Sequence, residues 1–286
     1  MSLGRVLDLL CCPVCRQPFT PTEGGVRCAQ GHTFDQARQG YLNLLQSRPP
    51  QHADTPAMVA ARERFLGGGH YRAIADGLVE AVHAGLRGGR PDPLAPLSVL
   101  EVGAGTGYYL QTLLDALPGR GVALDISVAA ARRAARTSPR IAAVVADTWQ
   151  PLPVADRVLD VLTCVFAPRN PAEFARVLRP DGVLAVVSPL PTHLAGLRES
   201  LGLMAVVEDK QERLGAALAP WFDPLDERRI QQRAGWPADV LIDLVAMGPN
   251  AFHADADRLA EQVHRLPDPL EVEVAVTVRT WRPSDR

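Results

Sequence analysis

The chain has 286 residues and is 47% hydrophobic, which is enough for one large domain with a small appendage. Its formal net charge of −2 gives no global basic field of the kind that marks many nucleic-acid-binding proteins, although a local basic patch is compatible with it. No apolar run approaches the roughly 20 residues of a membrane span, and the first residues lack the apolar stretch of a signal peptide. We therefore expect a soluble cytoplasmic protein.

Four of the five cysteines lie within the first 28 residues. Cys12 and Cys15 form a C-x-x-C pair, and after twelve further residues Cys28 and His32 form a C-x-x-x-H pair. Clustered cysteines in a chain without secretion signals indicate metal ligands, and two such pairs supply the four N and S donors that Zn²⁺ prefers. We predict a closed, structural zinc site at these four residues, with Cys11 outside it. Free buried thiols and a disulfide are the alternatives.

The composition divides the chain into three parts. Residues 1–40, rich in Cys, Pro and Gly, are the predicted zinc-binding unit, 41–96 a linker with helices, and 97–286 the catalytic domain. Apolar residues at helical spacing predict two helices within 58–87, separated by the glycine turn Gly67–Gly69. Forty residues build no sufficient core alone, so zinc is expected to supply the missing folding free energy of the first part.

From residue 97 onward, short apolar runs alternate with helical stretches. The runs predict strands at 97–102, 122–126, 141–146, 158–166 and 183–188. The stretches between them predict helices at 108–117, 129–137 and 171–178. Nearly continuous apolar strands with helices between them indicate a parallel sheet that is covered on both faces.

The C-terminal third continues with further helices and strands. We expect helical structure from 190 to about 219, a strand over 228–235 and a helix over 237–247. The segment LEVEVAVTVRTW at 270–281 alternates strictly between apolar and polar residues. This period of two predicts a final antiparallel strand with one exposed face.

A glycine turn stands between the first predicted strand and the first helix of this region. It contains Gly103, Gly105 and Gly107, and glycine lets a backbone turn tightly and approach a ligand closely. NAD and FAD sites use similar loops, so a dinucleotide site is an alternative. The spacing here is G-x-G-x-G, however, whereas the dinucleotide fingerprint is G-x-G-x-x-G.

Acidic residues end three successive strands of the predicted sheet. They are Glu101, Asp125 and Asp147, and ligands of parallel sheets bind at the carboxyl ends of the strands. Glu101 can face a positively charged sulfonium, Asp125 can accept hydrogen bonds from ribose hydroxyls, and Asp147 can approach an adenine amine. This set favours S-adenosylmethionine (SAM) as the cofactor. The arrangement resembles the α/β, Rossmann-like fold of class I SAM-dependent methyltransferases, whose mostly parallel sheet has seven strands.

Several segments together resemble the 23S ribosomal RNA (guanine-N1)-methyltransferases, a family with housekeeping and tylosin- or macrolide-resistance members. Besides the zinc pairs, they are GHTFDQARQGYLNLL at 31–45, DTPAMVAARERFLGGGHY at 54–71, VLEVGAGTGYY at 99–109, LDIS at 124–127 and VFAPRNPAEFARVLRPDGVLAVVSPLPTHL at 165–194. The similarity runs in order over about residues 11–194. The combination is specific, because unrelated methyltransferases share only the glycine loop.

The resemblance implies particular residues and a particular reaction. The implied zinc ligands are the four named above, and the implied SAM contacts are Tyr71, Gly105, Thr106 and His193. The implied reaction is methyl transfer to N1 of a guanine in 23S ribosomal RNA, in a hairpin loop near the exit tunnel. The family also suggests a homodimer, with either a housekeeping or a macrolide-resistance role.

No residue of the sequence identifies itself as a general base, so the catalytic residues stay unassigned. Cys164 lies inside a predicted strand, where a buried structural thiol is expected. Basic residues expected to contact RNA are Arg16, Arg27 and Arg38 in the zinc-binding unit and Arg169 near the cleft. Two other functions are open: a small-molecule methyltransferase with a zinc cap in antibiotic biosynthesis, and a non-catalytic zinc-dependent RNA-binding protein.

Overall fold

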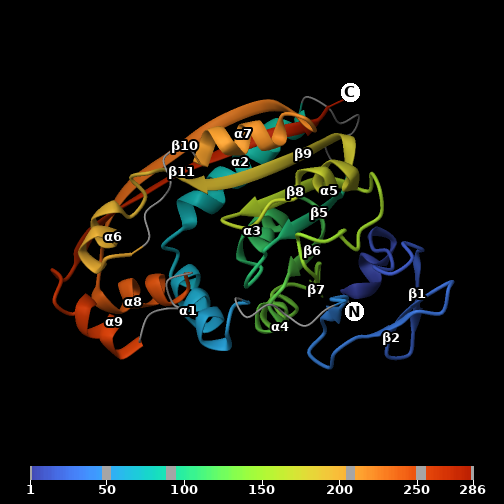
Figure 1. Ribbon diagram of the computed structural model, residues 1–286, viewed down its shortest axis with the longest axis horizontal. Helices are drawn as coiled ribbons and strands as arrows, with labels where there is room; N and C mark the ends of the chain where they lie inside the picture. The colour runs from blue at the N-terminus through green and yellow to red at the C-terminus, as the bar shows by residue number, and fades with distance from the viewer. Residues whose placement is uncertain (1, 47–52, 88–94, 204–209, 249–255, 285–286) are drawn as a thin grey trace.

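A mixed sheet of eight strands forms the centre of the computed structural model, which describes residues 2–46, 53–87, 95–203, 210–248 and 256–284 (Figure 1). The strands are β4 (Leu42–Asn43), β5 (Leu97–Val102), β6 (Gly119–Asp125), β7 (Ile141–Val145), β8 (Leu159–Val165), β9 (Leu178–Pro189), β10 (Phe222–Trp236) and β11 (Leu270–Pro283). Their order is β10-β11-β9-β8-β5-β6-β7-β4. Strands β4 to β9 pair in parallel, and β11 lies antiparallel between β9 and β10.

The strand order creates one switch point. From β5 the chain moves outward through β6 and β7, and it then returns to β8 on the other side of β5. Loops that leave β5 and β8 therefore diverge, and a crevice at such a point is where open parallel sheets bind ligands. The predicted parallel sheet is confirmed, with seven strands in the expected region and an eighth, β4, that the sequence did not predict.

Strand β11 differs from its prediction on one point. It is antiparallel as expected. The prediction that one of its faces is exposed to solvent was wrong, because residues 274–278 are buried on both faces. One face of the strand packs into a hydrophobic core cluster through Val274, Val276 and Val278. On the opposite face Thr277 hydrogen-bonds Gln211 of α7 (Lys210–Leu218) at 3.2 Å. A helix therefore covers Thr277, which the alternation assigned to solvent, whereas Glu271 near the start of the strand is exposed.

Helices cover both faces of the sheet. Besides α7, the helices of the described residues are α1 (Pro56–Gly67), α2 (Arg72–Arg87), α3 (Tyr108–Ala116), α4 (Val128–Ala134), α5 (Pro171–Val177), α6 (Ala195–Leu201), α8 (Ala238–Ala246) and α9 (Ala256–Val263). One core cluster joins α2, α3, α4 and α8 to the sheet, and a second joins α5 and α7 to its other face. Within β5, Val99 belongs to the first cluster and Leu100 to the second, which is the alternation of a strand buried on both faces.

The predicted helices are confirmed, with one interruption. The helical structure expected over 190–219 consists of α6 and α7, and residues 204–209 between them lie outside the described residues. Among the described residues, no helix has the length and apolar character that crossing a membrane demands.

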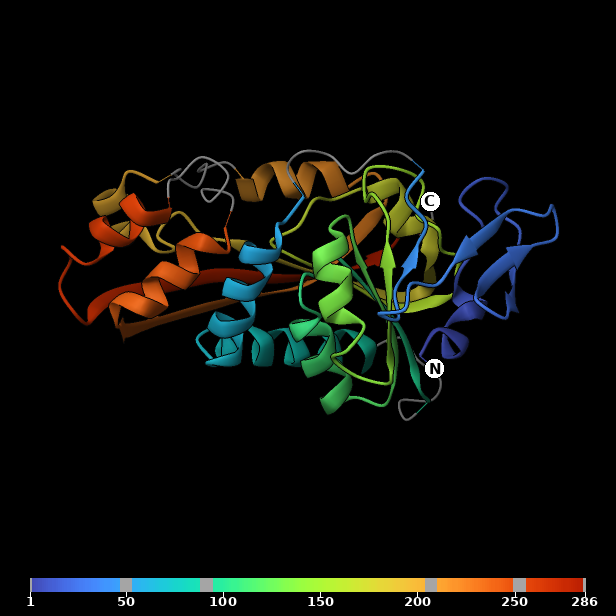
Figure 2. The ribbon, with the colours of Figure 1, turned by 90° about the horizontal axis from the view of Figure 1, so that it is seen from below.

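The N-terminal unit packs into the main domain. It contains a small antiparallel sheet of β1 (Phe19–Thr22), β2 (Gly25–Cys28) and β3 (Thr33–Asp35). Its apolar side chains, including Leu9 and Leu10, belong to the second core cluster. In both views it lies at one end of the long axis, whereas α8 and α9 lie at the other end (Figures 1 and 2). The unit is therefore fixed relative to the sheet.

An aromatic cluster joins α1 to the start of α2 and the end of β10. Phe65 is 1% exposed, and its ring lies edge-on to Tyr71 and Trp236, with centroids 4.8 and 5.3 Å away. Edge-to-face pairs add about 0.5–1.5 kcal/mol to the burial of their area. Phe65 thus holds Tyr71 in place from outside the sheet.

We predict that Phe65→Ala lowers the free energy of unfolding by about 3–5 kcal/mol, because it removes a fully buried ring and leaves a cavity. Urea denaturation measures the loss. Trp221, 45% exposed, is the matched control, and Trp221→Ala should change stability by no more than about 0.5 kcal/mol. Similar losses in the two variants would contradict the assigned role of Phe65.

Candidate functional site

The glycine turn adopts a backbone that other residues avoid. Gly103, Gly105 and Gly107 have φ angles of 63°, 54° and 79°, all in the left-handed region. A Cβ atom on Gly103 would lie 2.4 Å from the Cβ atom of Ala167, which follows β8. The three glycines are therefore required by backbone conformation, and the first also by the close approach of the β8 loop.

Two carboxylates hold this turn, Glu101, which is buried, and Asp125, which is half-buried. Glu101 accepts a hydrogen bond from the amide of Leu110 in α3 at 2.9 Å. Asp125 accepts from the amides of Gly105 and Ser127, both at 2.8 Å. Burial raises the pKa of Glu101 to about 8, and it also raises the pKa of Asp125. The turn is thus hydrogen-bonded to a pair of acids whose ionised forms a nearby positive charge would stabilise.

The remaining predicted cofactor residues lie in different settings. Thr106 is buried inside the turn, and its carbonyl accepts a hydrogen bond from Thr137 at 2.9 Å. Asp147 accepts from the amide of Trp149 at 2.9 Å, within its own loop. The structure thus brings Glu101 and Asp125 together at the turn, whereas the contact of Asp147 is local.

Tyr71 and His193 form a buried pair. The Tyr71 hydroxyl lies 3.2 Å from Nε2 of His193, and the amide of Ala275 donates to Nδ1 at 3.2 Å. Burial lowers the pKa of His193 to about 4, so the ring is neutral at pH 7. Because Nδ1 accepts a hydrogen bond, the proton is on Nε2 and is donated to the Tyr71 oxygen. The hydroxyl hydrogen of Tyr71 is then available to another acceptor.

Phe166 completes this corner and was missed by the sequence reasoning. It follows β8 with a φ of 54°, which is unusual for an aromatic residue, and is 40% exposed. Its ring is stacked on His193 with centroids 6.0 Å apart, and it lies 6.1 Å from Tyr71. In the sequence Phe166 continues an apolar strand, so periodicity gave no signal that its ring faces outward.

Arg62 is a second residue that the sequence reasoning did not single out. It lies on α1, forms an ion pair with Asp54 and donates to the carbonyl of Met247 at 2.7 Å. A Cβ atom on Gly105 would lie 3.1 Å from its Nη1 atom. Its sequence distance from the glycine turn explains why no local pattern revealed it.

The four predicted metal ligands converge. The sulfur atoms of Cys12, Cys15 and Cys28 and a ring nitrogen of His32 all lie within 4.8 Å of one another. The Cys15 and Cys28 sulfurs are 3.5 Å apart, well beyond a disulfide bond of about 2.05 Å. Cys11 is buried but lies outside this group. Four converging N and S donors fit a tetrahedral zinc ion with no open position.

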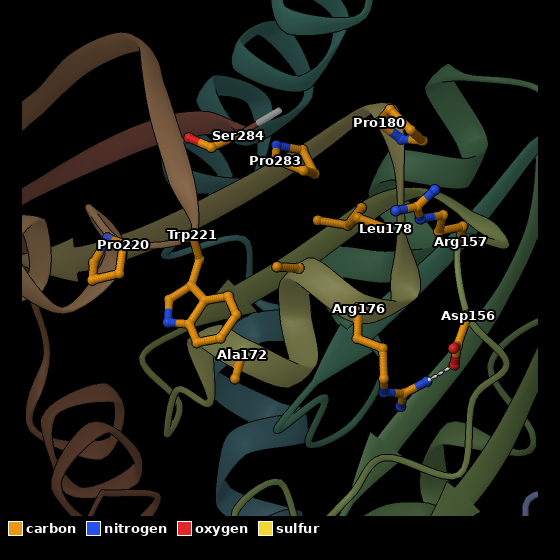
Figure 3. Close-up of a pocket in the computed structure, with 11 residues that line it drawn as sticks. Asp156, Arg157, Ala172, Arg176, Leu178, Pro180, Pro220, Trp221, Pro283 and Ser284 are labelled. Atoms are coloured by element: carbon orange, nitrogen blue, oxygen red, sulfur yellow. Dashed lines mark hydrogen bonds and ion pairs between the residues drawn. The ribbon is translucent and has the colours of Figure 1, made fainter. Parts of the chain in front are cut away.

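A surface hollow of about 500 Å³ lies away from the glycine turn (Figure 3). Its walls include Trp221, Leu178 and Arg157, together with Arg176, which forms a 2.6 Å ion pair with Asp156. Leu178 begins β9, so the hollow lies by the amino end of that strand, whereas the glycine turn lies at the carboxyl ends of the strands. Its position therefore separates it from the cofactor chemistry.

Comparisons with known proteins agree with this geometry. A family model described as "RlmA, N-terminal" matches residues 10–52, and one described as "Methyltransferase domain" matches 99–182. A "Putative 23S rRNA (guanine-N(1)-)-methyltransferase" of Micromonospora griseorubida is 45% identical over 97% of this chain and 98% of that protein. The "23S rRNA (guanine(748)-N(1))-methyltransferase" of Streptomyces fradiae is 42% identical over 98% of each chain.

We predict that the purified protein contains about one zinc ion per chain and that Cys28→Ser removes it and destabilises the fold, because binding and folding free energy are coupled. Metal analysis and thermal unfolding measure both effects. Cys11→Ser is the matched control and should retain the metal. Zinc loss in the control, or full zinc content in Cys28→Ser, would be incompatible with this ligand set.

The raised pKa of Glu101 predicts a pH dependence of stability. Between the ordinary glutamate value of 4.5 and about 8, the folded protein keeps a proton that the unfolded chain has lost. The contribution of Glu101 is therefore complete below pH 4.5 and is lost as the pH rises through 8, by at most about 1.4 kcal/mol per pH unit. Urea denaturation across this range should show the wild type losing stability relative to Glu101→Gln. A constant difference between the two would show that Glu101 ionises normally.

Proposed function

The chain belongs to the family of 23S rRNA (guanine-N1)-methyltransferases, and on this premise we propose that it transfers a methyl group from SAM to N1 of a specific guanine in 23S rRNA. The fold is that of a class I SAM-dependent methyltransferase with an N-terminal zinc-binding module. The observation that carries the proposal is the presence, in one chain, of a closed Cys₃His cluster and a glycine turn whose region is hydrogen-bonded to the carboxylates of Glu101 and Asp125. Two proteins named as rRNA methyltransferases are 45% and 42% identical to this chain over nearly its whole length, which favours this function over that of a small-molecule methyltransferase.

SAM supplies a methyl group on a positively charged sulfur. The residues proposed to bind it are Tyr71, Glu101, Gly103, Gly105, Thr106, Gly107, Asp125, Asp147 and His193. The glycines let the ligand approach the backbone, and a bound cation would favour the ionised form of Glu101, whose pKa burial raises to about 8. Each oxygen of Asp125 has a second lone pair beside the one used by the turn, which suits ribose hydroxyls.

The aromatic corner is suited to hold the acceptor base. N1 of guanine is buried in base pairing within a helix, so the base must come from a loop or be flipped out. Phe166 presents a partly exposed ring at the carboxyl end of β8, beside Tyr71 and His193. We propose that it stacks on the guanine, while the hydroxyl of Tyr71 donates to a ligand atom. Methyl transfer is an in-line displacement, so holding donor and acceptor in line is the main catalytic contribution.

We propose that the zinc-binding module binds RNA. We assign residues 1–40 to RNA recognition, 41–96 to the linker and helices, and 97–286 to catalysis. Arg27 and Arg38 are exposed, as a phosphate contact needs. Two other arginines predicted to contact RNA already bond to side chains of this chain. Arg16 forms an ion pair with Asp156 at 3.1 Å, and Arg169 donates to Ser188 at 2.8 Å.

Four finer features belong to the proposal. We propose a hairpin loop near the exit tunnel as the target, since guanine 748 is named for the S. fradiae relative. Because its proposed substrate is ribosomal, we propose that the enzyme acts in the cytoplasm. A homodimer and a role in macrolide resistance complete the proposal.

Primer extension on 23S rRNA tests the proposal, because a methyl on N1 blocks pairing and stops the polymerase. RNA treated with the protein and SAM should give one new stop at a guanine. Gly105→Arg should abolish it, since a side chain there is strained at a φ of 54° and meets Arg62. Gly215→Arg on α7, where the space is open, is the matched control and should retain the stop. No stop with the folded wild type would refute the proposed function.

A further inference from the structure

We propose that Arg62 binds the carboxylate at the amino-acid end of the methyl donor and so selects donors that carry this group. The inference rests on the proposed function, because it concerns the cofactor of the same site. It is carried by the position of Arg62 between the two segments that a SAM molecule must contact, the glycine turn and the loop after β6.

The position of Arg62 is defined from three sides. Its Nη1 and Cδ atoms would lie 3.1 and 3.2 Å from a Cβ atom on Gly105, so the side chain rests directly over the central glycine. Its ion-pair partner Asp54 accepts, through its main-chain oxygen, a 2.6 Å hydrogen bond from the Ser127 hydroxyl in the loop after β6. Its Nη2 atom donates to Met247 at the end of α8. The guanidinium is therefore held in place before any ligand arrives.

The guanidinium retains donors for a ligand. It has five N–H groups, and the bonds to Asp54 and Met247 use two of them. The Arg62 side chain is 24% exposed, so the site is reachable. A planar guanidinium also matches a carboxylate in shape and binds it through paired hydrogen bonds.

The charges of SAM require such a partner. Its amino-acid end carries an ammonium and a carboxylate next to the positive sulfonium. The carboxylate of Asp125 complements positive charge and repels a carboxylate, and Glu101 does the same when a bound cation favours its ionised form. The turn offers few substitutes, since the amide of Gly105 is bonded to Asp125, that of Leu110 to Glu101 and that of Gly107 to the carbonyl of Ala104. An arginine over Gly105 supplies the missing cation.

Asp54 makes this cation compatible with a positively charged donor. A free guanidinium over the glycine turn would repel the sulfonium. In the ion pair its charge is balanced by Asp54, and the pair as a whole is neutral. Asp54 also orients the guanidinium, so Asp54 is a positioning residue and Arg62 a binding residue.

Calorimetric titration with SAM and with decarboxylated SAM tests the proposal. The second ligand keeps the sulfonium and the amine and lacks only the carboxylate. The wild type should bind SAM about 10- to 100-fold more tightly, the value of hydrogen bonds to a charged partner. Arg62→Gln should lose this factor for SAM and leave the affinity for decarboxylated SAM unchanged within about 2-fold, whereas Arg62→Lys should keep part of it.

Arg64→Gln is the matched control, because Arg64 lies on the same helix and pairs with Asp243 of α8. It should bind both ligands as the wild type does. Equal affinity of the wild type for the two ligands, an equal loss of both in Arg62→Gln, or no loss at all would overturn the role of Arg62. A wild type that binds neither ligand would instead reject the cofactor site and the proposed function with it.

Discussion

The site depends on two acids, the buried Glu101 and the half-buried Asp125, that are hydrogen-bonded to the glycine turn and the helix after it. Glu101 and Asp125 lie on the adjacent parallel strands β5 and β6, so the sheet fixes their separation. Burying a carboxylate costs free energy unless it is hydrogen-bonded or neutralised. The backbone amides of Gly105 and Leu110 provide part of this compensation and hold the turn in its left-handed course. Burial raises the pKa of both acids despite these bonds, so a cation bound beside them would stabilise their charged forms.

The N-terminal module and the catalytic domain act as one body. Leu9, Leu10 and Phe19 share a hydrophobic cluster with the strands, and Leu42 extends the sheet next to Val144. Zinc therefore stabilises a piece of the same core. An RNA segment bound by the module would meet the methyl-transfer site at a fixed distance, which suits an enzyme whose catalysis depends on orientation.

Local pattern predicted most of the fold, and tertiary contact produced what it missed. The strands 97–102 and 141–146 were visible because both faces are buried, and the zinc ligands because their spacing is itself the signal. Strand β4 has two residues and no period to detect. Phe166 and Arg62 carry no local mark, because their meaning comes from His193 and Gly105, which lie far away in the sequence. The sequence thus predicted the glycine turn and its neighbouring acids. The positions of Phe166 and Arg62 beside them became visible only in the structure.

The net charge of −2 counted against an RNA-binding protein, and the structure explains why that sum is a poor guide. Many arginines of the described residues are paired with acids, such as Arg120 with Asp8 at 2.6 Å and Arg133 with Glu63 at 2.7 Å. Such pairs contribute little field beyond about a Debye length. Acidic and basic groups lie in different places: Glu101 is buried and Asp125 half-buried beside the glycine turn, whereas exposed arginines such as Arg27 lie on the N-terminal module. An enzyme that must hold a cation and a polyanion together needs this separation, and a total near zero is its natural consequence.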